Sequence, residues 1–114
     1  MCGINGIISN NITNNLDASI QKMNIFLKHR GPDASLYFND DTVALGHTRL
    51  SIIDLSESSN QPFYSSDKRY VIVYNGELYN YKQLKLTLQQ SAHGSGTIPY
   101  IFTTKSDTEV VLAA

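Results

Sequence analysis

The sequence predicts an α+β fold, because strand and helix patterns follow one another without the regular alternation of a parallel βαβ protein. Residues 3–9 (GINGIIS) form a short apolar run typical of a buried strand. Four apolar residues then recur at helical spacing: Leu16, Ile20, Met23 and Leu27. The 114 residues suffice for at most one domain, and 41% hydrophobic with 17% charged residues is typical of a folded globular chain.

Short strands are predicted in the middle of the chain. The Gly31-Pro32-Asp33 sequence ends the first helix and turns the chain. Strands follow over 36–38 and 43–45, joined by a hairpin turn at Asn39-Asp40-Asp41. The segment 49–55 is apolar and rich in β-branched residues, and it leads into a polar loop.

The last third predicts a buried strand over 70–74, a helix over 81–89, a Ser/Gly-rich loop over 91–97 and a strand over 98–103. Ser106 and Glu109 have the spacing of a capping box, so a final helix starts here. The chain stops about two turns later. Domains rarely end in so short an apolar helix, so we expect this chain to be cut short.

Composition argues against several classes of function. The net charge is -1 and the nine Lys and Arg residues are scattered, which disfavours nucleic-acid binding. A single cysteine allows no intramolecular disulfide. The N-terminus lacks the features of a signal peptide, and no apolar run reaches the roughly 20 residues of a membrane span. We expect a cytoplasmic protein with no membrane contact, and the three histidines have no metal-like spacing.

Cys2 is the first candidate for chemistry. A free cysteine is usually a small buried apolar residue. At position two, however, removal of Met1 would leave a free α-amine on the same residue as the thiol. That amine has a pKa of about 8, so one residue could supply both nucleophile and base. A protease-like pair of Cys2 with His47 is formally possible but unnecessary.

Three further candidates each have a structural alternative. Asn75-Gly76 is a strong signal for a type I′ hairpin turn, but its side-chain amide and backbone N–H could also form an oxyanion hole. Arg49 would ordinarily be a solvated edge residue, yet its fork suits an α-carboxylate. Asp107 is explained by the helix dipole alone, although it could hold an ammonium group.

Six motifs together resemble the glutaminase domain of asparagine synthetases, a class II glutamine amidotransferase domain. They occur in the family's order and span nearly the whole chain: MCGINGI at the start, HRGPD at 29–33, GHTRLSIIDLS at 46–56, QPF at 61–63, NGELYNY at 75–81 and SDTEVVL at 106–112. Each motif alone is weak, whereas six in order are specific.

The resemblance implies an N-terminal nucleophile hydrolase, a four-layer αββα sandwich that residues 1–114 contain only in part. It implies that L-glutamine is the substrate, with Cys2 as nucleophile, its α-amine as base, and Asn75 and Gly76 as the oxyanion hole. The substrate-binding residues by resemblance are Arg49 for the α-carboxylate, the pocket-lining strand Leu50, Ser51, Ile52 and Ile53, and Glu77 and Asp107 for the amino end. The HRGPD loop is expected to pack beside the nucleophile.

The resemblance also replaces one interpretation and adds expectations about the wider protein. The family enters a helix after NGE, so the hairpin at Asn75-Gly76 is abandoned. No cofactor is expected in this chain; ATP and Mg are expected for a synthetase domain that residues 1–114 lack, and a homodimer is possible in the full-length family. Two alternatives stay open: a non-catalytic remnant, and an amidotransferase that delivers ammonia to a different acceptor.

Overall fold

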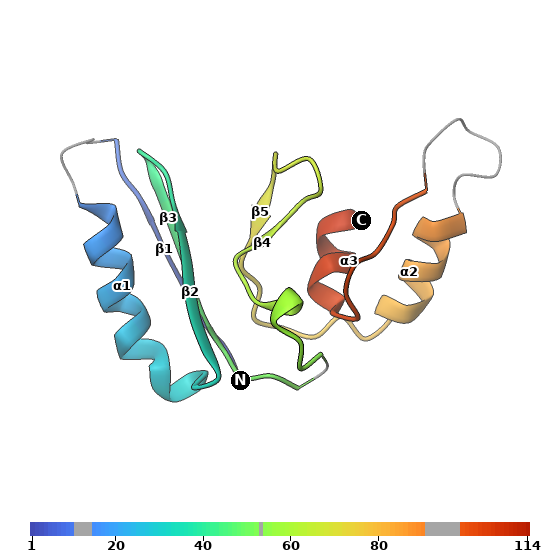
Figure 1. Ribbon diagram of the computed structural model, residues 1–114, viewed down its shortest axis with the longest axis horizontal. Coiled ribbons are helices and arrows are strands. Elements are labelled where there is room, and N and C mark those ends of the chain that lie inside the picture. Colours follow the sequence, from blue (N-terminus) through green and yellow to red (C-terminus); the bar gives the residue numbers. More distant parts are fainter. Residues whose placement is uncertain (11–14, 53, 91–98) are drawn as a thin grey trace.

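The computed structural model describes residues 1–10, 15–52, 54–90 and 99–114. Helix α1 lies against one face of a three-stranded sheet, and a small two-stranded sheet lies between that sheet and helices α2 and α3 (Figure 1). The α+β prediction is confirmed. The elements are β1 (Gly3–Ile8), α1 (Leu16–Leu27), β2 (Ala34–Asn39), β3 (Val43–Arg49), β4 (Phe63–Tyr64), β5 (Val71–Ile72), α2 (Tyr81–Gln90) and α3 (Asp107–Ala113), with short 3-10 turns at Lys28–Arg30 and Glu57–Ser59.

The larger sheet has the strand order β1-β3-β2, and both pairings are antiparallel. The face that meets α1 is apolar at one end, where Leu16, Ile20 and Ala44 are buried and Ile7 and Met23 pack around them. The predicted helical spacing therefore identified the face of α1 that meets the sheet.

The same face of the sheet is polar at its other end. Asn24, on α1, donates to the Leu36 carbonyl (2.9 Å) and accepts from the Asn5 side chain (2.8 Å). Both amide oxygens lie where a Cβ at position 46 would stand, so only glycine fits at Gly46. This amide pair links α1 to all three strands, because Asn5 belongs to β1, Leu36 to β2 and Gly46 to β3.

The boundaries of α1 agree with the sequence prediction. Asn15 caps the helix by accepting from the Ala18 N–H (2.9 Å), and the 3-10 turn leads into Gly31. A Cβ at Gly31 would overlap the backbone of Thr48 and Arg49, so the chain turns there at close range to β3. Antiparallel strands β2 and β3 extend further than predicted and are joined through Asp40, whose carboxylate accepts from two backbone N–H groups.

Three segments predicted as strand are wholly or partly irregular, for a shared physical reason. A strand needs backbone donors free for a neighbouring strand, and in these segments side chains take them. Strand β3 ends at Arg49, so residues 50–52 form no strand, and the predicted position 53 lies outside the described residues. The Leu50 N–H donates to the Cys2 sulfur and the Ser51 N–H to Asp33.

The strand predicted over 70–74 shrinks to β5, and it is half-buried rather than buried. Tyr70 is 58% exposed, and the Tyr74 N–H donates to the Gln61 side chain (2.5 Å). Within 98–103 no residue from 99 onward is in a strand, and residue 98 is outside the described ranges. There the Thr103 N–H donates to Glu109 instead (2.8 Å).

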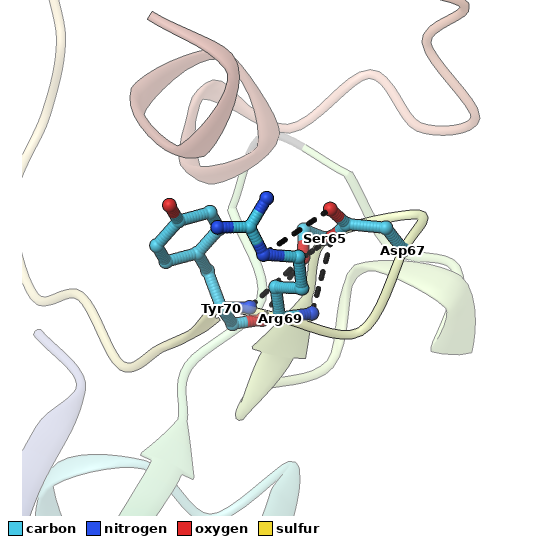
Figure 2. A network of polar contacts seen from close by, with 4 residues as sticks. All are labelled: Ser65, Asp67, Arg69 and Tyr70. Carbon is cyan, nitrogen blue, oxygen red and sulfur yellow. Dashed lines mark hydrogen bonds and ion pairs between the residues drawn. The ribbon is translucent and has the colours of Figure 1, made fainter.

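The β4–β5 hairpin closes through a side-chain network at its tip (Figure 2). Ser65 donates to Asp67 (2.6 Å) and accepts from the Tyr70 N–H (3.0 Å). Arg69 lies over the Tyr70 ring at 5.4 Å and its backbone N–H donates to Asp67. Lys68 takes the left-handed conformation that this tight turn requires, with φ of 57°. Local hydrogen bonds therefore hold a hairpin of only two paired residues per strand.

Helices α2 and α3 form where predicted and pack against each other. Ser106 caps α3 by accepting from the Thr108 N–H (3.1 Å), whereas Glu109 does not reach back to the cap. Its carboxylate instead accepts from the backbone and hydroxyl groups of Thr103 and Thr104. The predicted loop over 91–97 lies outside the described residues. None of the helices in the described ranges is both long and apolar enough to cross a membrane.

Candidate active site

A cavity of about 380 Å³ lies where the N-terminus, the end of β3, the loop after it, the segment before α2 and the start of α3 meet. Eight of the residues predicted for the site line it: Cys2, Arg49, Leu50, Ile52, Asn75, Gly76, Glu77 and Asp107. Ser51 is not among the lining residues, since its N–H is directed to Asp33 (2.7 Å). Ile53 lies outside the described residues. Positions more than 100 residues apart in sequence are thus brought to one cavity.

Cys2 immediately precedes β1 and is half-buried. Its thiol lies 3.6 Å from the Leu50 carbonyl, and its sulfur accepts from the Leu50 N–H at 3.3 Å. A Cβ on the next residue, Gly3, would stand 2.6 Å from the Thr48 hydroxyl, so the chain beside the sulfur has no room for a side chain. The sulfur is therefore held against the backbone that follows β3, rather than against His47.

The HRGPD loop lies beside Cys2, as the resemblance implied. Arg30 donates from Nε to the Cys2 carbonyl (3.2 Å). Asp33 accepts from the Ser51 N–H, and its own N–H donates to the Arg49 carbonyl (3.0 Å). The loop thus holds both the residue that carries the sulfur and the segment that faces it.

Arg49 is 8% exposed, so the interpretation of a solvated edge residue is wrong. Nη1 donates to the Ser56 carbonyl (2.8 Å) and to the Asn60 side chain (2.6 Å), and Nη2 donates to the Asp54 carbonyl. A guanidinium has five N–H donors. These contacts use three, which leaves Nε–H and one Nη2–H without an acceptor among the described residues.

Asp54 fastens the same loop to the start of α3. Its carboxylate accepts from the Ser56 hydroxyl (2.6 Å), the Ser56 N–H (2.9 Å) and the Lys105 N–H (2.9 Å). The hydrogen bonds from Ser56, followed by that from Lys105, hold the pKa of Asp54 well below its usual range. The carboxylate is therefore ionised at neutral pH and acts as a fixed acceptor at the edge of the cavity.

Asn75 and Gly76 are exposed and lie in an irregular connection that leads to α2, so the alternative of a β-hairpin turn is excluded. A Cβ added at Gly76 would stand 2.7 Å from the Tyr74 hydroxyl, which makes glycine the residue that fits without displacing the ring. The side-chain amide of Asn75 and the backbone N–H of Gly76 have no acceptor among the described residues. Both groups remain available to a ligand.

The segment 75–77 is fastened on both sides. Before it, the Tyr74 N–H donates to Oε1 of Gln61 (2.5 Å). After it, the Leu78 N–H donates to Oδ2 of Asp107 (2.9 Å). Asp107 is 6% exposed. Its role is therefore more than a favourable charge in the first turn of α3, because it also accepts a hydrogen bond from the segment that carries Asn75.

Several cavity residues were not predicted for the site from the sequence, and Gln61 and His47 are two of them. Gln61 entered only as part of the QPF motif. His47 is 1% exposed and neither ring nitrogen has a hydrogen-bond partner among the described residues. Burial is the main cause that lowers the pKa of His47 to about 4, and the positive charge of Arg49 lowers it further. The Tyr74 carbonyl opposes this shift, although its geometry does not make a hydrogen bond with either ring nitrogen. The available signal was its position two residues before Arg49, which places both side chains on one face of β3.

The half-buried Cys2, the incompletely paired Arg49, and the Asn75 amide beside the Gly76 N–H line one cavity. The whole chain, residues 1–114, matches the family described as "Glutamine amidotransferase domain". The chain belongs to this family.

Among similar proteins are two glutamine-hydrolysing asparagine synthetases. Asparagine synthetase 1 of Bacillus subtilis is 41% identical over 116 residues, which cover 99% of this chain and 17% of that protein. Asparagine synthetase B of Escherichia coli is 40% identical over 87 residues, or 76% of this chain and 14% of that protein. Amidase chyE of Penicillium rubens is 36% identical over 124 residues, which cover 99% of this chain and 17% of that protein. The predicted resemblance to the asparagine synthetase glutaminase domain is confirmed, and the chain spans less than a fifth of the length of each of these three relatives.

Proposed function

We propose that this domain hydrolyses the side-chain amide of glutamine to glutamate and ammonia through Cys2, and that the ammonia serves the ATP-dependent amidation of aspartate. The observation that carries the proposal is the convergence of Cys2, Arg49, Asn75-Gly76 and Asp107 on one cavity. The similarity to two glutamine-hydrolysing asparagine synthetases supports it further.

Glutamine binding in this proposal uses the donors and acceptors that the protein leaves available. The two unpaired N–H groups of Arg49 receive the α-carboxylate, whose charge they complement. Oδ1 of Asp107 has no donor among the described residues and, with Glu77, receives the α-ammonium group. Leu50 and Ile52 line the same cavity and supply apolar surface for the side chain of glutamine.

The proposed chemistry begins with removal of Met1, which gives Cys2 a free α-amine. The amine takes the thiol proton, and the thiolate attacks the amide carbon to form a C–S bond. The resulting oxyanion accepts hydrogen bonds from the Asn75 side-chain amide and the Gly76 N–H, a stabilisation that acts mainly in the transition state. The α-ammonium then protonates the leaving nitrogen, ammonia departs, and water hydrolyses the thioester to glutamate and free thiol.

The wider setting is part of the same proposal. The order of α1, the three-stranded sheet, β4–β5, and the α2–α3 pair in Figure 1 supports a partial four-layer αββα sandwich. The described residues hold no group of three or more side chains suited to a metal ion. We assign ATP and Mg to a synthetase domain outside residues 1–114, and no step here involves them. A cytoplasmic location and a homodimer remain predictions.

The test compares three forms of the natural-length protein that carries this domain: one with a free N-terminal Cys2, one with a permanent N-terminal extension, and Cys2→Ala. Glutamate and ammonia are measured after addition of glutamine. We expect activity only in the first form, because the extension removes the basic amine and the substitution removes the nucleophile. Equal rates in all three would refute the mechanism, and no activity in any would identify a non-catalytic remnant.

A further inference from the structure

Gln61 links three parts of the cavity wall through one buried side chain. It is 7% exposed and comes from the loop that follows β3. Its Oε1 accepts from the Tyr74 N–H at 2.5 Å, and its Nε2 donates to the Thr108 hydroxyl at 3.1 Å. Thr108 lies in the first turn of α3 and is 3% exposed. Both polar ends of the Gln61 amide are therefore satisfied inside the protein.

These two bonds complete a ring around the 75–77 segment. From Gln61 the ring passes through Tyr74 to Leu78, whose N–H donates to Asp107 (2.9 Å), and returns through the adjacent Thr108. The backbone N–H groups that flank the segment are thus both tied to neighbouring residues of α3. The Leu78 N–H bonds directly to Asp107, whereas the Tyr74 N–H is connected to Thr108 through the Gln61 side chain.

We infer that Gln61 is a positioning residue that sets the orientation of Asn75 and Gly76 toward the reacting carbonyl oxygen. This inference rests on the proposed function, because it concerns the oxyanion hole of that reaction. Gln61 acts through the Tyr74 backbone rather than on substrate. The segment it holds has no strand partner and is exposed, so its conformation depends on the flanking ties.

The side-chain chemistry at position 61 is specific. The Tyr74 N–H needs an acceptor, which an apolar residue of similar length cannot supply. A displacement of about 1 Å in a catalytic group can lower a rate about 100-fold. Loss of the Tyr74 tie should therefore reduce turnover while the contacts of Arg49 with the glutamine α-carboxylate persist.

The experiment uses the natural-length protein with Gln61→Met, which keeps the side-chain length and removes both polar atoms. We expect kcat for glutamine hydrolysis to fall about 10- to 100-fold while KM changes less than about threefold. Amide hydrogen exchange at Tyr74 should accelerate in the same variant. A kcat within about twofold of the unsubstituted protein, or unchanged exchange at Tyr74, would overturn the inference.

Thr108→Val and Thr108→Ser form a matched pair that keeps the test decisive if Gln61→Met does not fold. Valine removes the acceptor for Nε2 of Gln61, whereas serine retains it. We expect a lower kcat and faster amide exchange at Tyr74 for Thr108→Val only. Equal kcat and equal exchange rates in Thr108→Val and Thr108→Ser would contradict the role of the ring. Failure of the proposed function has a different signature, since the unsubstituted protein would then release no ammonia while the exchange differences persisted.

Discussion

Acidification should destabilise the protein through His47, whose buried ring has no hydrogen-bond partner among the described residues. Its folded-state pKa of about 4 lies below the ordinary value of 6.5, so the unfolded chain binds this proton more readily than the folded one. The contribution to stability is complete above pH 6.5 and is lost as pH falls toward 4. One pKa unit corresponds to about 1.4 kcal/mol. The expected loss is about 2 kcal/mol at pH 5 and about 3 kcal/mol near pH 4.

The assay is urea unfolding of the protein and of His47→Gln at pH 7.5 and pH 5. Every other titrating group is common to both proteins, so the change in their difference isolates His47. We expect the unsubstituted protein to lose about 2 kcal/mol more than the variant. NMR titration of the ring supplies an independent midpoint. A midpoint near 6.5, or an equal pH dependence in both proteins, would refute the argument from burial.

Three further substitutions separate binding, chemistry and stability. Asn75→Ala should lower kcat by about 10²–10³ with a smaller effect on KM, since in the proposed mechanism its bond to the oxyanion forms in the transition state; steady-state glutaminase kinetics measure both. Arg49→Lys should raise KM for glutamine about 10-fold or more, because hydrogen bonds to a charged group contribute about 1.5–3 kcal/mol and lysine lacks the fork; an unchanged KM would remove it from the binding site. Glu109→Gln should lower the free energy of unfolding by about 2–3 kcal/mol, because an amide N–H₂ would face the donors of Thr103 and Thr104; thermal or urea unfolding decides this, and an unchanged midpoint would contradict it.

Local signals in the sequence were sufficient for much of the fold. The spacing of Leu16 and Ile20 identified the buried face of α1, and Ser106 marked the start of α3. These predictions succeed because helix periodicity and capping depend on residues a few positions apart. The cavity was predicted in a different way. The chemistry of Arg49 and Asp107 made them candidates with a structural alternative each, and the family motifs then assigned both residues to one site.

The failures came from contacts between distant residues. Tyr74 and Thr103 have the residue types of strands, but Gln61 and Glu109 accept from their backbone N–H groups. No local pattern records which side chain will take a backbone donor. His47 was passed over for a similar reason: its depressed pKa follows from burial in the assembled structure, not from its sequence neighbours.

The ring around residues 75–77 also bears on when this domain gains its cavity during synthesis. Gln61 cannot donate to the Thr108 hydroxyl until Thr108 has been made, and Asp54 cannot accept from the Lys105 N–H until Lys105 has been made. Contacts that close such long loops form late, because the entropy of closure is lost before they stabilise the fold. A ribosome-bound chain that has not yet exposed residues 105–108 therefore has Cys2 and Arg49 but lacks one wall of the cavity. Cys2 is made about 100 residues before the residues that complete its cavity. While the intervening segment is synthesised, the nascent chain therefore carries the thiol without the complete cavity around it.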